Sequence, residues 1–197
     1  MTARLHPGVV RHVWDHFVLG LRDGTAEARL SLYAIAWSPA LGGGNVALLD
    51  LPDGSARAWA DQPGLGEGMQ ARLRVIGSTA GSAEVPVASA RFERAPGGLD
   101  GFSWRIEGDD GVLVARWGSV RPAIWAEGRA PAFWDREDIW ACFVDASVAS
   151  IELDGRLLPG APWLADVWVP TLGRALWSAH VALAEVRVDP VHETMTP

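Results

Sequence analysis

The chain has 197 residues, of which 49% are hydrophobic and 21% are charged, and its formal net charge is −7. This composition predicts a globular protein, and the acidic charge argues against nucleic acid or an anionic membrane surface as a partner. All 17 basic residues are arginine. Mechanisms that need a lysine, for a Schiff base, for pyridoxal phosphate or for a Walker loop, are therefore excluded. Arginine without lysine, together with many Ala, Gly and Val residues, is typical of a GC-rich bacterial genome.

Residues 8–21 have a hydrophobic pattern that fits a helix period and a strand period equally well. Further along, short alternating or apolar runs between Gly and Pro residues predict strands. These strands are expected at residues 30–37, 45–51, 57–59, 71–76, 84–93, 123–127, 139–144 and 178–188. Residues 64–68 are rich in glycine and are expected to form a loop. Residues 164–176 contain Pro170 and Gly173, so no continuous helix is expected there.

Asp-Gly turns recur along the chain, and Asp-Gly between alternating segments is the strongest short-range signal for a β-hairpin. The five pairs begin at Asp23, Asp53, Asp100, Asp110 and Asp154. They predict hairpins over residues 101–120 and 147–158. Short strands at regular spacing predict an all-β fold: a single antiparallel lipocalin-like β-barrel, or a closed sandwich, with few short helices. We expect one domain over residues 1–197.

The sequence lacks the motifs of nucleotide, dinucleotide and zinc-protease sites and of the nucleophile elbow, so we expect no cofactor and no metal. The single cysteine, Cys142, lies in an apolar run and is expected to be buried and inert. His12 and His16 share a face in a helix or in a strand, but a metal would need a third ligand, which favours a packing or surface role. Asp15 and His16 form a further candidate, a carboxylate–imidazole pair that could move a proton.

Tryptophan is the most distinctive feature of the composition, because 11 Trp stand against one Tyr and 5 Phe. Such rings line cavities or fill cores. Trp125 and Glu127 face the same side of a predicted strand. If that side is a cavity, burial raises the pKa of Glu127 and makes it a general acid; if it is solvent, Glu127 is an ordinary surface residue. The predicted catalytic residues are Glu127 and Tyr33, and the predicted substrate-binding residues are Trp125, Trp104, Trp140, Trp117, Trp37 and Phe102.

The closing third of the chain contains the motifs Asp138-Ile139-Trp140-Ala141-Cys142, Ile151-Glu152-Leu153-Asp154-Gly155, Leu158-Pro159-Gly160, Pro162-Trp163 and Leu172-Gly173-Arg174. Together they resemble the closing segment of the carotenoid hydratase-like proteins, a group of lipocalin-like β-barrel domains that fungal decalin-forming Diels-Alderases also resemble. The segment Trp14-Asp15-His16 is similar to the Asp-His motif of that group. The resemblance implies a barrel whose lumen holds a long apolar or polyene substrate.

These observations favour a cofactor-independent cyclase or isomerase, because a shaped, dry cavity that orients its substrate can catalyse such a reaction without a cofactor. The expected reaction is a cyclisation or pericyclic-type rearrangement of an apolar polyene or polyketide-like intermediate in bacterial natural product and antibiotic biosynthesis. Two alternatives stay open: a non-catalytic lipocalin-like carrier of an apolar small molecule, and a structural or interaction domain with a filled core.

The expected partner is an apolar small molecule, and a homodimer is left open. The N-terminus lacks the layout of a secretory signal. No stretch reaches the ~20 apolar residues that span a bilayer. The expected location is therefore the cytoplasm.

Overall fold

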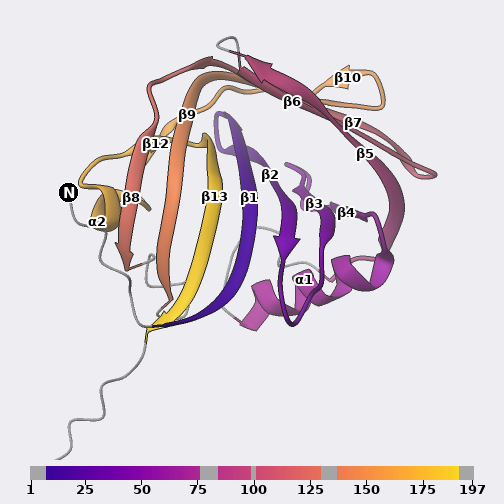
Figure 1. The fold of residues 1–197 in the computed structure, drawn as a ribbon. Helices are drawn as coiled ribbons and strands as arrows, with labels where there is room; N and C mark the ends of the chain where they lie inside the picture. Colours follow the sequence, from indigo (N-terminus) through magenta and orange to yellow (C-terminus); the bar gives the residue numbers. More distant parts are fainter. Residues whose placement is uncertain (1–7, 76–83, 99–100, 130–136, 191–197) are drawn as a thin grey trace, which may run out of the picture.

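The structure is a computed structural model that describes residues 8–75, 84–98, 101–129 and 137–190. Strands make up most of it, and the predicted all-β class is confirmed (Figure 1). The elements, in chain order, are β1 (Gly8–Asp23), β2 (Ala26–Trp37), β3 (Gly44–Asp50), β4 (Ala56–Ala60), α1 (Pro63–Val75), β5 (Val87–Gly98), β6 (Gly101–Gly108), β7 (Gly111–Val120), β8 (Ile124–Arg129), β9 (Asp138–Leu153), β10 (Arg156–Leu157), β11 (Leu164–Ala165), α2 (Val169–Leu172), β12 (Leu176–Trp177) and β13 (Ala179–Pro190).

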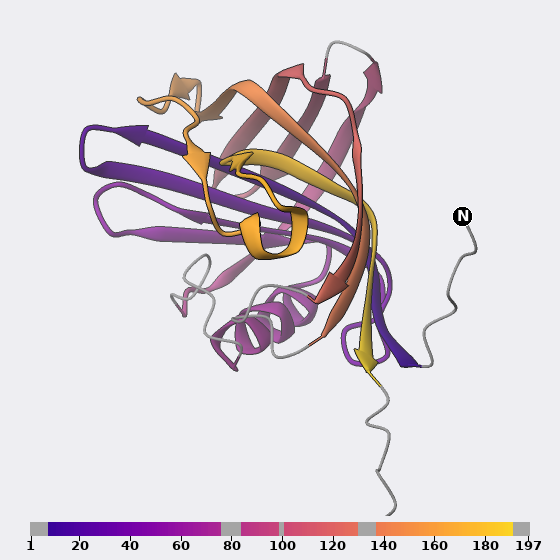
Figure 2. The same ribbon diagram turned by 90° about the vertical axis from the view of Figure 1, so that its left-hand side faces the viewer.

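Nine of the strands in the described residues close into a barrel. Their order is β9-β13-β1-β2-β3-β4-β5-β6-β7, and β7 pairs again with β9 (Figures 1 and 2). Neighbouring strands are antiparallel except for β4 and β5, which run parallel because α1 lies between them in the chain. The predicted closed barrel is therefore confirmed, and the expectation of a wholly antiparallel sheet is corrected at this one pair. β8 pairs with β9 outside the ring.

The Asp-Gly turns join strands as predicted. Four of the five pairs lie in described residues and connect β1 to β2, β3 to β4, β6 to β7 and β9 to β10. Gly24 and Gly155 have φ of 60° and 77°, values that glycine adopts without strain. Asp100 lies outside the described residues. Residues 8–21, whose hydrophobic pattern fitted both a helix and a strand, belong to the strand β1. The strands predicted at residues 139–144 and 147–153 form one continuous strand, β9.

The helix α1 corrects two predictions at once. Residues 64–68 were expected to form a loop and residues 71–76 a strand, yet Pro63–Val75 is helical. Glycine disfavours a helix interior, but Gly66 is needed here: a Cβ atom at this position would lie 2.5 Å from Val87 Cγ1. The absence of a side chain lets α1 pack closely against the barrel wall, where Leu65, Met69 and Leu73 are buried.

The sheet has an apolar core on each of its two faces. The interior core fills the barrel and draws on every strand of the ring, including Phe17, Leu19, Leu30, Leu32, Trp59, Trp104, Ile106, Leu113, Trp117, Ile151 and Val181. The outer core lies between the opposite face and α1, and it includes Tyr33, Ile35, Val46, Leu48, Met69, Leu73, Ile139, Phe143 and Trp168. Large side chains therefore pack on both faces of strands β1 to β3.

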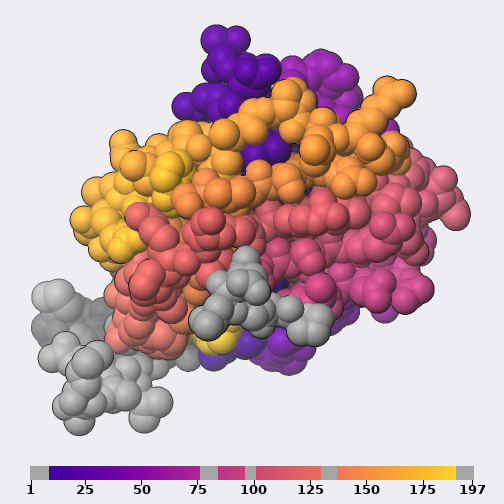
Figure 3. Space-filling view, turned by 90° about the horizontal axis from the view of Figure 1, so that it is seen from above, coloured from indigo at the N-terminus to yellow at the C-terminus, as the bar shows by residue number. Residues whose placement is uncertain are grey.

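The segment that follows β10 lies beside β1 near the β1–β2 hairpin, beyond the start of β13. Seen from above, orange residues lie between the indigo and the red parts of the chain (Figure 3). Arg22 pairs through its backbone with Ala161, and its guanidinium lies 4.1 Å from the ring centre of Trp163. The Pro-Trp motif thus packs against the β1–β2 hairpin. No helix within the described ranges is both long and apolar enough to cross a membrane.

Candidate functional site

The predicted acid and its neighbouring ring lie on the surface. On β8, Ala126 faces the outer core, while Trp125 and Glu127 stand on the other face and are exposed, Trp125 by 59%. Of the two alternatives for the environment of Glu127, the structure shows solvent, because β8 lies outside the closed ring and this face of it is exposed. Trp140 of β9 lies opposite Glu127 and is half-buried. The catalytic role of Glu127 is untested and stays a prediction.

The other predicted side chains divide between three places. Trp104 and Trp117 are buried in the interior core, and Phe102 packs against that core. Trp37 is 48% exposed. Tyr33 is buried in the outer core. Four strand spacings of about 4.8 Å, or about 19 Å along the sheet, separate β8 from β2, and Glu127 and Tyr33 are on opposite faces of the sheet. The structure does not bring the two predicted catalytic residues together.

A cluster of polar side chains, which sequence reasoning missed as a unit, is buried on the outer face of β1. His12, Trp14 and His16 share this face because they alternate along the strand. We name it the buried polar cluster, and it comprises His12, Trp14, His16, Tyr33, Arg72, Glu137, Glu185 and Arg187. Asp15 points to the opposite face, so the carboxylate–imidazole pair predicted for Asp15 and His16 is wrong.

Glu185 is the centre of the cluster. Its Oε1 accepts hydrogen bonds from Trp14 Nε1 at 2.8 Å and from Arg187 Nε at 2.6 Å. Its Oε2 lies 4.0 Å from His16 Nδ1 and has no hydrogen-bond partner within the described residues. Glu185 and Arg187 are both fully buried. A carboxylate that is held on one oxygen and leaves the other for an imidazole can stabilise that imidazole when it takes up a proton.

His16 stacks on Tyr33, with ring centres 4.1 Å apart and planes at 12°. Burial lowers the pKa of His16 well below its ordinary value, and the charge of Arg187, together with that of His180 when His180 is protonated, lowers it further. The imidazole is therefore neutral at pH 7 and can accept a proton. Burial and the charge of Glu185 raise the pKa of Tyr33, which keeps its phenol protonated and able to donate. The pair supplies one acceptor and one donor side by side.

The cluster reaches the surface at Arg72. This arginine belongs to α1, is 24% exposed, and its Nη2 donates to Glu137 Oε1 at 2.6 Å. Arg72 Nε and Glu137 Oε2 are buried without hydrogen-bond partners in the described part of the chain. His12 Nε2 is also buried without a hydrogen-bond partner among these residues, while His12 Nδ1 is 3.0 Å from Ser38 Oγ. Burial lowers the pKa of His12 to about 3, and the charge of Arg72 adds to this effect.

Unpartnered polar atoms of this kind are rare in protein interiors, and sites that bind a ligand or do chemistry are one place where they occur. His180 shows the contrast within the same face of the sheet. Its Nε2 accepts from Trp168 Nε1 at 3.2 Å, and its Nδ1 lies 2.9 Å from the carbonyl of Trp177. Both ring nitrogens of His180 are therefore satisfied by the fold itself, as is typical of a structural histidine.

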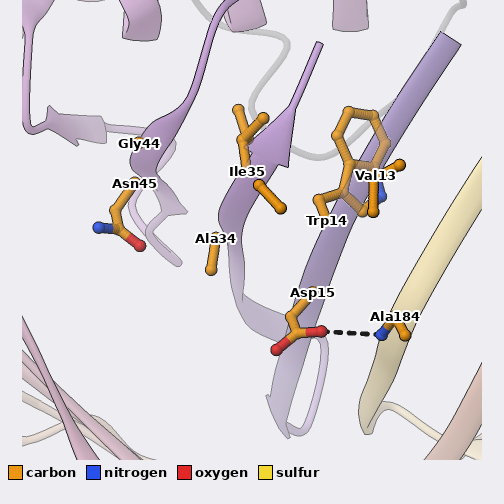
Figure 4. Close-up of a pocket in the computed structure, with 9 residues that line it drawn as sticks. Val13, Trp14, Asp15, Ala34, Ile35, Gly44, Asn45 and Ala184 are labelled. Carbon is orange, nitrogen blue, oxygen red and sulfur yellow. Dashed lines mark hydrogen bonds between the residues drawn. The ribbon is translucent and has the colours of Figure 1, made fainter.

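A β-bulge in β13 aims Glu185 into the cluster. The register between β13 and β1 shifts between Trp14 and His16, and Ala184 has φ of 47°, which an L-residue rarely adopts. Asp15 holds this backbone, because its Oδ1 accepts the Ala184 N–H at 2.8 Å (Figure 4). A bulge inserts one residue and reverses the alternation beyond it. Glu185 and Arg187 therefore face the same side as Ala182.

Sequence reasoning placed Glu185 and Arg187 in a strand but gave no signal for their burial. In the run Glu185-Val186-Arg187-Val188 the alternation of charged and apolar residues is typical of a strand with a solvated polar face. The bulge reverses that assignment, and no glycine marks it. The signal that could have pointed here was the spacing of His12, Trp14 and His16, which the structure confirms on a single face.

A pocket of about 450 Å³ lies on the other face of β1. We call it the mouth pocket, since it sits at the end of the barrel away from the β1–β2 hairpin; it is lined by Val13, Trp14, Asp15, Ala34, Ile35, Ala36, Gly44, Asn45 and Ala184 (Figure 4). Its lining is mainly small and apolar, and Asp15 is its only ionisable residue. Cys142, expected to be buried, is half-buried on the same face as Trp125. Across the described residues, no three His, Cys, Asp or Glu side chains gather as a metal site.

Comparison with known proteins adds little. No family model matches the chain, and no curated protein matches it. Among solved structures, the chain is similar to the crystal structure of acetoacetate decarboxylase from Legionella pneumophila subsp. pneumophila str. Philadelphia 1, with a TM-score of 0.41 and 9% sequence identity over 96% of this chain and 88% of that chain. A likeness at this level carries no argument about activity. The resemblance to the carotenoid hydratase-like proteins stays a prediction.

Proposed function

We propose that the protein is a cofactor-independent isomerase or cyclase that moves a proton on an apolar small molecule, with the buried polar cluster as its active site. One observation carries the proposal: a neutral imidazole, a protonated phenol and a carboxylate, one oxygen of which accepts no hydrogen bond from the described residues, are buried together. Burying charges is costly, and apolar residues in their place are often no less stable. Such an arrangement is therefore typical of a site kept for chemistry.

The proposed reaction is a proton shift. His16 takes a proton from a carbon of the substrate, and Glu185 stabilises the imidazolium that forms, since its Oε2 is 4.0 Å from His16 Nδ1. Tyr33 donates a hydrogen bond to the oxygen on which negative charge develops. His16 then returns the proton to a second carbon of the substrate. Substrate and product have the same composition, so the step needs no oxidant, reductant or cofactor.

The surroundings of the cluster favour an apolar substrate. Ile35, Val46 and Leu48 continue the outer core beside Tyr33, and Met69 and Leu73 cover them from α1. The ion pair between Arg72 and Glu137 joins α1 to the start of β9 at the partly exposed edge of the cluster. We expect a substrate to reach His16 by separating this pair. A dry site then strengthens the interaction of Glu185 with the imidazolium.

The test uses an alkyl-substituted β,γ-unsaturated cyclohexenone in D2O as a probe of proton transfer. Absorbance follows the conjugated isomer, and mass spectrometry follows deuterium in the product. The wild-type protein should convert the probe faster than buffer alone, and His16→Gln and Glu185→Gln should each lower the rate by about 10²–10⁴-fold. Near-UV circular dichroism checks that both variants fold.

The matched control is Glu127→Gln, which makes the same carboxyl-to-amide change on the exposed face of β8. It should leave the rate unchanged. A wild-type rate no higher than that of buffer would contradict the proposal. So would a rate that falls in Glu127→Gln and persists in Glu185→Gln, because the working acid would then lie on β8.

The mouth pocket favours the carrier function as a second candidate. Its volume of about 450 Å³ falls in the range of ligand pockets, and its lining is mainly apolar. A carrier would bind apolar molecules there and release them unchanged. Chromatography of the ligand recovered after binding separates the two functions, since only the enzyme yields an isomer.

A further inference from the structure

Arg94 of β5 spans the mouth of the barrel. Its Nη1 donates to Asp15 Oδ2 on β1 at 2.9 Å, 79 positions away in the chain. On the way its guanidinium passes over three rings of the interior core, with Cζ at 4.9 Å from the ring centre of Phe17, 5.8 Å from Phe102 and 5.9 Å from Trp104. Aromatic faces attract a cation at this range. The rings and Asp15 together fix the guanidinium at the edge of the mouth pocket, which Asp15 lines.

The guanidinium keeps donors for a ligand. Arginine has five N–H donors, and its one hydrogen bond to the described residues is that to Asp15. The side chain is 34% exposed, so the remaining donors are accessible. Asp15 accepts one hydrogen bond on each of its oxygens, from Ala184 N–H and from Arg94. The N–H donors of Arg94 that Asp15 does not use can bind an anion at this edge of the pocket.

From this geometry we infer that the mouth pocket binds an apolar carboxylic acid. The carboxylate bonds to the free edge of Arg94, in the bidentate manner that arginine favours. The apolar part of the molecule lies against Val13, Ala34 and Ala36. Ala184 bounds the pocket beside Asp15 (Figure 4). Arg94 and Asp15 lie on the face of β1 opposite to the buried polar cluster, which shares only Trp14 with the lining of the pocket, so this site holds whether or not the cluster is catalytic.

The probe is cis-parinaric acid, a fluorescent polyene acid that receives excitation energy from nearby tryptophans such as Trp104 and Trp14, and its methyl ester is the uncharged control. The wild-type protein should bind the acid about tenfold more tightly than the ester, since a charge-assisted hydrogen bond is lost with the charge. Arg94→Gln should remove this preference and leave the affinity for the ester unchanged.

Two further variants keep the result interpretable. Arg91→Gln changes an exposed arginine of the same strand, 73% exposed in its side chain, and should keep the preference for the acid. Ala34→Phe fills the pocket and should abolish binding of both probes. The inference would be overturned if the wild-type protein bound neither probe, or bound acid and ester equally. It would also be overturned if the preference for the acid survived Arg94→Gln, or if Ala34→Phe left binding unaltered.

Discussion

Strand β1 has two faces that differ in chemistry. On its outer face, His12, Trp14 and His16 point into a buried cluster of charges and rings beneath α1. On its inner face, Asp15 stands at an open pocket and Phe17 begins the filled barrel core. Alternation along a single strand thus separates a buried polar site from an accessible ligand pocket by the thickness of one backbone.

The difference shows that two features of the fold decide what is buried: the closed barrel buries aromatic rings, and the bulge in β13 buries charged side chains. The interior core accepts large apolar rings from all around the closed ring. Glu185 and Arg187 are buried on the outer face because the bulge in β13 directs both side chains to that face and because the two side chains bond to each other. Stability alone favours the apolar face, so the polar face is where we locate function.

The largest expected effect comes from removing the central carboxylate. In Glu185→Leu, the buried Arg187 loses its carboxylate and Trp14 Nε1 loses its acceptor. Loss of one partner of a buried ion pair costs about 3–5 kcal/mol. Urea unfolding measures this change. The double variant Glu185→Leu/Arg187→Leu should recover most of the lost free energy, and a double variant as unstable as the single one would show that Arg187 is not the reason.

The second effect is a loss of stability in mild acid. The folded-state pKa values of His12 and His180 are lowered to about 3 and about 4 by burial, whereas an unfolded histidine has its ordinary value of 6.5. The unfolded chain therefore binds more protons below pH 6.5. Their contribution to stability is fully present above that pH and is lost as the pH falls towards 4.

Between pH 6.5 and 5 the free energy of unfolding should decline with a slope approaching about 1.4 kcal/mol per pH unit for each of these histidines. This window lies above the range where most carboxylates take up protons. Urea unfolding at several pH values measures the slope, and His12→Asn should make it shallower. A stability that is constant over this window would contradict the neutral state of the buried imidazoles.

The third effect tests the bulge that links the two faces. Ala184 adopts φ of 47°, which costs an L-residue roughly 1–2 kcal/mol, whereas glycine adopts it freely. Ala184→Gly should therefore stabilise the protein by up to about 1 kcal/mol, after allowance for the greater freedom of glycine in the unfolded chain. Thermal unfolding provides the measurement. Destabilisation by Ala184→Gly would mean that the bulge is not strained.

The smallest effect is expected on β8. Trp125 is mostly exposed, so Trp125→Ala should change the free energy of unfolding by less than about 0.5 kcal/mol. Trp117→Ala is the matched comparison, because this ring is buried in the barrel and donates to the carbonyl of Val18. Truncation of a buried ring costs about 3–5 kcal/mol. Similar losses in both variants would place Trp125 in a core.

Local signals were enough to predict the barrel. Asp-Gly between alternating runs predicts hairpins because the turn conformation depends on those two residues alone. The β6–β7 pair follows this pattern from Gly101 to Val120. The helix α1 could not be predicted in the same way. Its glycines argue against a helix locally, and their purpose, close contact between Gly66 and Val87, depends on the assembled fold.

The candidate site was harder to predict than the fold. Tyr33 was predicted as catalytic, and the structure does bring it against His16, but the pairing of His16 with Glu185 joins residues 169 positions apart across a bulge. Alternation assigns a side chain to one of two faces and does not say which face is covered. For this reason Trp125 and Trp117 looked equivalent in the sequence, although one is on the surface and the other in the core.

The central claim is that His16 is a neutral base held beside Glu185. The ¹⁵N chemical shifts of the His16 ring, followed by NMR from pH 7 to pH 5, test it most directly. The account predicts a neutral imidazole throughout this range, because burial lowers the pKa of His16 well below its ordinary value. The signals of an imidazolium that forms near pH 6.5 would contradict it.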